Sequence, residues 1–328
     1  MKVRMLSAAL LMIASGCAVC PFCGKEKLEP VKLTKLGTYD MFIVEANPVV
    51  FKGKLWMMEY IRWERSDKRY RFNNTGDSYF RFRDMSGKMD RFTPAFANGL
   101  HMGCAFVEGD TVYVTAVNKW GGTRYYIMES QDLENWSEPR LILENPAWEG
   151  YNSTMCKAGD RYVLSFELGE PIADVKEPFT MYFAESKDLK EFKVVEGAKM
   201  GDDRYTGAPM LRWFDGWFYY FHLEGTYETG FKTRVARSRD LYSWQFSDKV
   251  VLDYTPEDKL IHPNAYFTEE ERRYIAAAKD VNASDLDMCY FDGKLRCFYS
   301  WGNQRGNEFS ALAEADCTAQ EFCESFFK

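Results

Sequence analysis

The sequence lacks the features that several common functions require. Acidic residues (49) outnumber basic ones (42), which leaves a net charge of −7 and no basic surplus for binding a phosphate backbone. Nucleic acid is therefore excluded as the main partner. After the N-terminus no apolar run is long enough to span a bilayer. A glycine-rich phosphate loop, a histidine-rich zinc motif, a Gly-x-Ser-x-Gly motif and an evident Ser/His/Asp set are also absent, so no cofactor is predicted.

The N-terminus has the pattern of an export signal. Lys2 and Arg4 form a charged start and Leu6 to Ala14 an apolar segment. The following Ala14-Ser15-Gly16-Cys17 is similar to the cleavage box of bacterial lipoproteins, in which the cysteine is lipidated. We predict a signal peptide over residues 1–17 and a lipoprotein anchored at Cys17, in the periplasm or on the outer membrane or cell surface. This anchor would be the only membrane contact. The alternative is an ordinary secretory peptide cleaved nearby.

Nine cysteines are many for an exported protein. Cys20 and Cys23 form a Cys-x-x-Cys, but no second pair with zinc spacing follows, and both lie in a weakly patterned segment, 18–38, that reads as a tether. Metal or redox chemistry is not expected there. The cysteines beyond the tether lie in apparent strands, where a thiol packs as a small apolar side chain. Their oxidation state stays open.

What the chain does have is aromatic residues, at 16%, and a repeated hairpin. In residues 208–222 an apolar strand turns at Asp215-Gly216 and returns as a second apolar strand, as expected of a two-residue hairpin turn. A glycine at the centre of such a hairpin occurs five times, at intervals of 56, 50, 57 and 77 residues. The five are Gly53, Gly109, Gly159, Gly216 and Gly293.

A second marker has the same period. A Ser-x-Asp-Leu turn occurs at Ser130, Ser186 and Ser238, and each copy ends a third strand. Two markers with one period predict an all-β fold, a five-bladed β-propeller over residues 39–328. The long last interval is explained by an inserted helix at 267–280, which Thr268 and Glu271 begin as a capping box. The segment 39–44 is expected to supply the outer strand that closes the last blade.

These hairpins and turns resemble the five-bladed β-propeller glycoside hydrolases, the superfamily of arabinanases, β-xylosidases, invertases and levansucrases. The resemblance covers about residues 40–325 as architecture and blade pattern. It implies a funnel-shaped site with carboxylates from the inner strands, namely an Asp base on the first blade, often before a proline, an Asp that tunes a pKa, and a Glu acid. Here the residue before Pro48 is Asn47, which cannot act as a base. Glu45 is the nearest carboxylate, so the chemistry is either relocated or absent.

Counting from the hairpin glycines predicts which residues face the funnel. Positions about eight before or after each glycine should reach the same rim, because the two strands of a hairpin run to the same face. Among the polar residues selected this way, four carboxylates are predicted to be catalytic: Glu45, Glu167, Glu224 and Asp285. Glu167 and Glu224 follow apolar strands that would raise the pKa of an acid. Each of the four has an alternative reading as a solvated or structural carboxylate.

Further polar and aromatic residues at the blade entries are predicted to bind the substrate. They are Asn47, His101, Trp148, Tyr151, Asn152, Tyr205, Asp287 and Trp301. Stacking and amide contacts suit sugars, although most aromatic residues must belong to the core. His101 and Asp287 are expected to hold hydroxyl groups. The acidic pair Asp285 and Asp287 would also suit a divalent cation, which nothing else in the sequence supports.

The leading hypothesis is a glycoside hydrolase that cleaves an oligo- or polysaccharide with two carboxylates. Glu224 or Glu167 would be the acid, and Asp285 or Glu45 the base. Inversion is expected from the resemblance and requires the two carboxyl groups to lie about 6.5–9.5 Å apart. The main alternative is a non-catalytic glycan-binding propeller lipoprotein, which Asn47 favours. A protein-interaction propeller is a third possibility.

Overall fold

The computed structural model describes residues 29–62, 78–171, 175 and 177–328. The predicted signal peptide, Cys17, Cys20, Cys23 and most of the predicted tether lie outside these residues.

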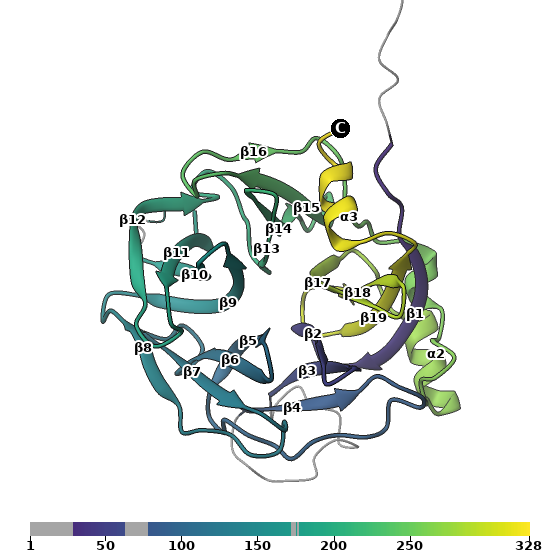
Figure 1. The fold of residues 1–328 in the computed structure, drawn as a ribbon. Helices are drawn as coiled ribbons and strands as arrows, with labels where there is room; N and C mark the ends of the chain where they lie inside the picture. The colour runs from purple at the N-terminus through teal and green to yellow at the C-terminus, as the bar shows by residue number, and fades with distance from the viewer. Residues whose placement is uncertain (1–28, 63–77, 172–174, 176) are drawn as a thin grey trace, which may run out of the picture.

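Five antiparallel sheets surround a central axis, and each begins with its innermost strand (Figure 1). The first three blades are β2 (Ala46–Phe51), β3 (Lys54–Arg62) and β4 (Ser78–Asp84); β5 (His101–Glu108), β6 (Thr111–Val117), β7 (Arg124–Ser130) and β8 (Arg140–Glu144); and β9 (Glu149–Ala158), β10 (Arg161–Glu170), β11 (Thr180–Ser186) and β12 (Lys193–Met200). The fourth is β13 (Met210–Phe214), β14 (Trp217–Thr226), β15 (Gly230–Ser238) and β16 (Gln245–Phe246). The fifth is β17 (Ala283–Phe291), β18 (Lys294–Gly302), β19 (Glu308–Ala315) and β1 (Thr34–Met41). The prediction of a five-bladed propeller is confirmed.

All five predicted hairpin glycines lie in the turns between the first two strands of the blades, and all have positive φ. Their place in the turn differs, however. In blades 1, 4 and 5 the glycine is the second turn residue, whereas in blades 2 and 3 it is the first, because Glu108 pairs with Thr111 and Ala158 with Arg161. This offset of one residue matters for the site.

The Ser-x-Asp-Leu turns form one repeated hydrogen-bonding unit. At Ser130 the hydroxyl oxygen accepts hydrogen bonds from the amides of Asp132 and Leu133, and the Asp132 carboxylate accepts from the amides of Glu134 and Asn135. The turns at Ser186 and Ser238 repeat the pattern. Each Asp thus satisfies two backbone donors, which is why the motif recurs at the ends of third strands.

The ring is closed by a strand from the beginning of the described chain. Strand β1 pairs antiparallel with β19 and so completes the blade that begins with β17. The prediction that this region closes the last blade is confirmed, but the strand begins at Thr34. Residues 34–38 therefore belong to the propeller and not to the predicted tether.

The inserted helix is also confirmed, as α2 (Glu269–Ala277). Thr268 is its N-cap, and its side chain and that of Glu271 form the predicted capping box. A second short helix, α3 (Ala319–Ser325), packs Phe322 and Cys323 into the core beside the last blade. No helix in the described part of the chain is long and apolar enough to cross a membrane.

A buried ionic cluster joins the closing strand to the first blade. Arg83 on β4 forms ion pairs with Asp40 on β1 and with Glu59 on β3, and Arg81 also binds Glu59, with Nε 2.8 Å from the carboxylate. All four side chains are at most 3% exposed. Burial opposes the ionisation of Glu59, but the two arginines outweigh it and lower its pKa; for Asp40 burial dominates and raises the pKa.

We expect Arg83→Ala to lower the free energy of unfolding by about 3–5 kcal/mol, because it removes the cation that pairs with buried Asp40 and leaves buried Glu59 with Arg81 alone. Arg124→Ala is the matched control. Arg124 pairs with Glu144 on the surface, where both side chains are more than two-fifths exposed, and its loss should cost less than about 1 kcal/mol. Chemical denaturation of both variants measures the difference, and equal losses would contradict the role given to the cluster.

Candidate functional site

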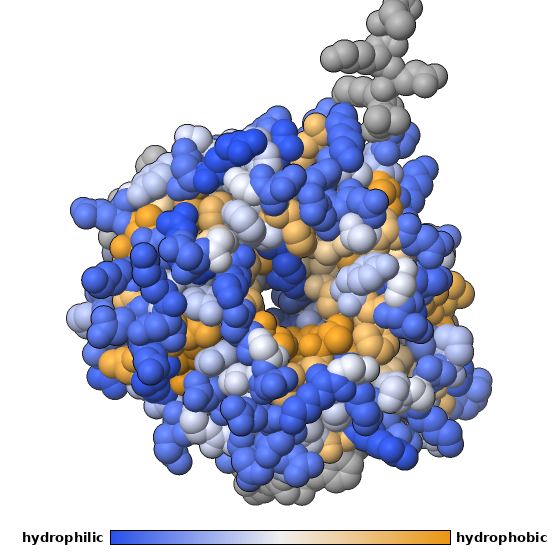
Figure 2. Space-filling model, in the orientation of Figure 1, coloured by the Kyte–Doolittle hydropathy of each residue, from blue (hydrophilic) through white to orange (hydrophobic). Residues whose placement is uncertain are grey.

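A narrow pocket lies on the axis, at the end where the inner strands begin. It is lined by Glu45, Asn47, Gly103, Asn152, Ser153, Ala208, Pro209, Asp285, Leu286 and Asp287. These residues come from the starts of the inner strands of all five blades. The solvent-accessible volume is about 20 Å³, enough for about one water molecule. Figure 2 shows one face of the ring, which is hollowed at its centre.

Asp285 is the best-defined carboxylate of the pocket wall. The Ser284 hydroxyl donates to its Oδ2 at 2.5 Å. Its backbone has a φ of +50°, and a bulge in the pairing of β17 with β18 surrounds it. Aspartate tolerates this left-handed conformation better than most residues. Burial, and next the charge of Glu45, raise the pKa of Asp285 to about 7.

Glu167 lies directly behind the pocket wall. It comes from β10, is 2% exposed, and its Oε2 accepts a hydrogen bond from the Asn152 amide at 3.2 Å. Burial is the main cause that raises its pKa to about 8; the bonds from Asn152 oppose the shift, while the charges of Asp285 and Glu45 add to it. The side chain is therefore mostly protonated at neutral pH.

Gly207 leaves room for the other oxygen of Glu167. A Cβ added to Gly207 would lie 2.9 Å from Oε1 of Glu167 and 2.8 Å from the Tyr205 hydroxyl, closer than side chains pack. The phenol and the carboxyl group therefore flank one small space beside Ala208 of the pocket wall. Burial, Glu167 and Asp285 together raise the pKa of Tyr205, so its hydroxyl stays protonated.

Two further predicted residues line the pocket but have partners of their own. Asp287 forms an ion pair with Arg212 and also accepts a hydrogen bond from the Met288 amide at 2.6 Å. Burial raises the pKa of Asp287 and Arg212 opposes the shift. The oxygen of Asn47 accepts a hydrogen bond from the Ala105 amide at 3.4 Å. Asp287 is thus already bound to a cation in the wall, which leaves Glu45, Asp285 and Glu167 as the electrostatically linked acids.

Glu224 does not join these carboxylates. The glycine is the second turn residue in blade 4 but the first in blade 3, so counting from it shifts the position in the strand by one residue. Glu167 is the sixth residue after the start of β10, and the sixth after the start of β14 is Leu223. A shift of one residue turns a side chain to the other face of its sheet. Glu224 lies opposite Lys232 on β15, and its charge acts on Arg204, away from the pocket.

Trp301 is also placed differently from the prediction. It is fully buried, its ring stacks on Phe309 at 4.3 Å, and its Nε1 donates to the Thr38 hydroxyl at 2.8 Å. Trp301 is the seventh residue after the start of β18, as Glu224 is in β14, whereas Glu167 is the sixth residue after the start of β10. The ring is therefore part of the core between blades and offers no face to a sugar.

His101, Tyr151 and Trp148 do not line the pocket. His101 bonds to the Tyr60 hydroxyl through Nδ1 at 2.6 Å. Tyr151 is buried and donates to Glu149 at 2.6 Å, while the adjacent Asn152 lines the pocket. Trp148 packs on Phe166 at 5.0 Å.

Sequence reasoning missed the residues that support the acids, among them Ser284, Gly207 and Arg212. In the sequence, Ser284 before Asp285 and Gly207 before Ala208-Pro209 are weak indications of a site. Only the register of the strands shows which side chains these residues contact.

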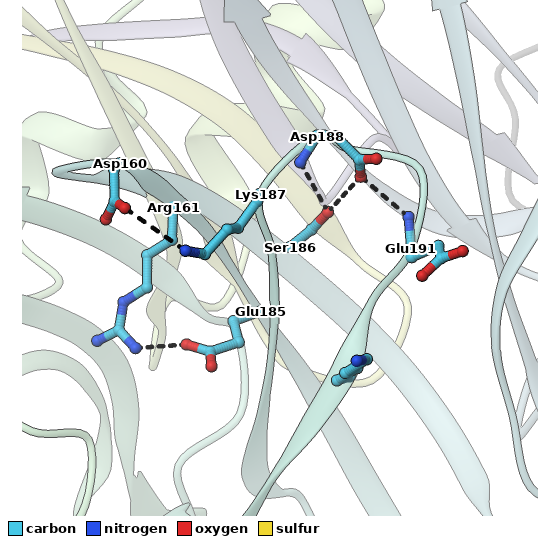
Figure 3. A pocket seen from close by; sticks show the side chains of 8 residues that line it. Asp160, Arg161, Glu185, Ser186, Lys187, Asp188 and Glu191 are labelled. Atoms are coloured by element: carbon cyan, nitrogen blue, oxygen red, sulfur yellow. Dashed lines mark hydrogen bonds and ion pairs between the residues drawn. The ribbon is translucent and has the colours of Figure 1, made fainter.

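A much larger hollow lies elsewhere, at the turn face of blade 3 (Figure 3). It has about 610 Å³ and charged walls, but the charges are engaged: Arg161 pairs with Glu185, Lys187 lies 3.8 Å from Asp160, and Asp188 caps its turn. Within the described residues no group of three or more His, Cys, Asp or Glu side chains is arranged to hold a metal ion. The six cysteines of that part of the chain are free thiols.

Comparison with solved structures identifies the class of fold. No protein-family model matches the sequence, and no curated protein matches it. The structure superimposes on a GH43 protein of Bacillus licheniformis (TM-score 0.54, 14% identity, 87% of this chain and 54% of that one) and a xylan β-1,4-xylosidase of Bacillus halodurans (0.55, 13%, 90% and 55%). It also superimposes on the catalytic domain of a GH62 α-L-arabinofuranosidase of Coprinopsis cinerea (0.59, 10%, 88% and 98%).

The chain thus has the five-bladed propeller fold of the GH43 and GH62 glycoside hydrolases, as the resemblance in sequence predicted. It is divergent from them in sequence and spans about half the length of the two Bacillus proteins.

The pKa of Glu167 predicts a pH-dependent stability. Its ordinary pKa of about 4.5 applies to the unfolded chain, so between about 4.5 and 8 the folded state holds a proton that the unfolded state has lost. Stability should therefore fall as the pH rises through this window, by at most about 1.4 kcal/mol per unit. Asp285 contributes only up to about pH 7. In Glu167→Gln the fall between pH 7 and 8 should disappear, as measured by chemical denaturation; an unchanged slope would contradict the assignment.

The close contacts of Gly207 predict that even one methyl group disturbs the site. Gly207→Ala should displace Glu167 or Tyr205 and cost about 1–3 kcal/mol of stability, as overpacking does. Gly109→Ala is a control for the loss of a glycine: its backbone has a positive φ, which disfavours alanine, but a Cβ there meets nothing within 4 Å. If only Gly207→Ala also alters the pH dependence of stability, the contact with Glu167 is verified; an unaltered dependence would count against it.

Proposed function

We propose that this protein is a glycoside hydrolase that cleaves an oligo- or polysaccharide, with Glu167 as the general acid and Asp285 as the general base. The observation that carries the proposal is the group of three linked acids, Glu45, Asp285 and Glu167, where the inner strands of the propeller meet. The fold is one that glycosidases use, and carboxylates held in different protonation states are what hydrolysis of a glycosidic bond requires.

The roles of Glu167 and Asp285 follow from their protonation states and from the hydrogen bond that orients Asp285. Glu167, with a pKa of about 8, holds a proton at neutral pH and would give it to the leaving oxygen. Asp285, with a pKa of about 7, is largely ionised just above neutrality and is oriented by Ser284. The pocket beside Asp285 has room for about one water molecule, the nucleophile that a base activates in an inverting reaction. Glu45 raises the pKa of Asp285 and is the alternative base.

Glu167 must reach the substrate from behind the wall. Its Oε1 lies in the space that a side chain at Gly207 would occupy, next to Ala208 of the pocket wall. A sugar ring is far larger than the pocket, so it would lie in the mouth above, with its bond over this space.

The proposal predicts a bell-shaped pH profile. The ratio kcat/KM should rise as Asp285 deprotonates near pH 7 and fall as Glu167 deprotonates near pH 8. Xylose- and arabinose-containing oligosaccharides are the first substrates to test, because solved structures with this fold include a xylosidase and an arabinofuranosidase. A profile without an alkaline limb would contradict Glu167 as the acid.

Substitution separates the candidates for each role. Glu167→Gln and Asp285→Asn should each lower kcat by a factor of about 10²–10⁴, whereas Glu224→Gln should leave it within about twofold because that side chain lies away from the pocket. Glu45→Gln should lower the pKa of Asp285, so the acidic limb of the pH profile should move to lower pH, while most of kcat is retained. Loss in Glu45→Gln together with full activity in Asp285→Asn would exchange the two roles.

The rival is a glycan-binding propeller without turnover. Two observations favour it: Asn47 stands where the resembled enzymes have their base, and Glu167 is only 2% exposed. Binding of an oligosaccharide by the wild-type protein, with no product released across the substrate panel, would support this reading. Export as a lipoprotein anchored at Cys17 stays part of the proposal, and metabolic labelling with a fatty acid in wild type and Cys17→Ala tests it.

A further inference from the structure

Beside the pocket, one tryptophan is held out to solvent in a way that the core does not explain. Trp120 lies in the loop between β6 and β7 and is 50% exposed. Strand β6 starts at the hairpin turn of blade 2 and ends at the opposite face, where the inner strands begin. Trp120 therefore stands on the same face as the carboxylate pocket.

The loop that carries Trp120 is fixed to the neighbouring blade. Gly122 and Gly150 exchange two backbone hydrogen bonds, of 2.9 and 2.6 Å, which form an isolated bridge to β9. The Asn118 side chain also accepts bonds from the amides of Thr123 and Arg124. An aromatic ring on such a loop is ordered before any ligand arrives, so binding to it costs little conformational entropy.

The surroundings of the ring connect it to the acids. The Arg62 guanidinium lies 4.7 Å from the centre of the Trp120 ring, and Arg62 is 8% exposed. The same arginine favours the ionised form of Asp285. The Tyr151 ring also meets Trp120 edge-on at 5.9 Å, and the next residue along β9, Asn152, lines the pocket.

We propose that Trp120 is a stacking platform for a sugar residue next to the one whose bond lies over the pocket, so that the protein recognises a glycan of at least two residues. This inference rests on the proposed function. A pyranose or furanose ring has a face of C–H groups that gains by covering an aromatic ring, and hydroxyl groups at its edge that need polar partners. Trp120 offers the apolar ring, and the Arg62 guanidinium beside it offers hydrogen-bond donors.

The platform is tested by binding, in a background that does not turn over the ligand. In the Glu167→Gln protein, calorimetry measures the affinities for xylotriose and arabinotriose and for the two monosaccharides. Adding Trp120→Ala should weaken binding of the favoured trisaccharide at least tenfold and change monosaccharide binding less than twofold. Trp120→Phe should retain most of the affinity. Tyr242→Ala is the matched control, because Tyr242 is equally exposed, at 53%, but lies in a Ser-x-Asp-Leu turn at the other face.

The outcomes separate this inference from the proposed function. Unchanged trisaccharide affinity in Trp120→Ala, with the wild-type protein still hydrolysing the sugar, would overturn the platform alone. Equal loss for trisaccharide and monosaccharide would also overturn it, because the ring would then belong to the pocket itself. If the Glu167→Gln and wild-type proteins bind no sugar of the panel, both the platform and the proposed function are wrong. Circular dichroism and the Tm of each variant verify that folding is retained.

Discussion

The architecture depends on the pairing of one strand from the beginning of the described chain with the last blade. Without β1, the edge of β19 would be left with unpaired backbone groups, and the ring would have an open seam. The same strand carries Asp40, which meets Arg83 of the first blade in a buried ion pair. Closure thus joins blade 5 to blade 1 twice, by backbone pairing and by charge. Because the ring is closed, Glu45 and Asp285, which are far apart in the sequence, come to face one pocket.

Bringing these acids together has an electrostatic cost that the fold does not remove. Arg212 offsets only part of the burial of Asp287, whose pKa is still raised, and the raised pKa values of Asp285 and Glu167 show that burial and mutual repulsion outweigh their hydrogen bonds. Part of the cost is avoided because Glu167 keeps its proton at neutral pH. Proteins retain such arrangements at functional sites, where acids in different protonation states are useful. The left-handed backbone at Asp285 and at the neighbouring Ala208 is a second local strain at the same place.

Under the proposed function, the shape of the site would divide sugar recognition from chemistry. The pocket on the axis has room for about one water molecule, so a sugar would have to be recognised at its mouth. The mouth is formed by loops between strands, which vary without disturbing the blades. Trp120 belongs to such a loop, whereas Arg62 and Tyr151, which contact its ring, belong to strands β3 and β9. A divergent propeller can therefore keep its ring while the residues that select a glycan change.

Several features were determined by the sequence alone. The hairpin glycines, the Ser-x-Asp-Leu turns and the capping box at Thr268 depend on contacts within a few residues, and each was found where it was predicted. Glu45, Asn47, Asp285 and Asp287 line one pocket because blades 1 and 5 have the same turn register, while their roles stay predictions. Glu224 and Trp301 were misplaced because counting from a glycine ignores whether it is the first or second turn residue, and one residue reverses the face of a strand. What only the tertiary structure decided is which side chains meet across blades, such as Glu167 with Gly207 or Arg62 with Trp120, because such contacts depend on how whole sheets pack around the axis.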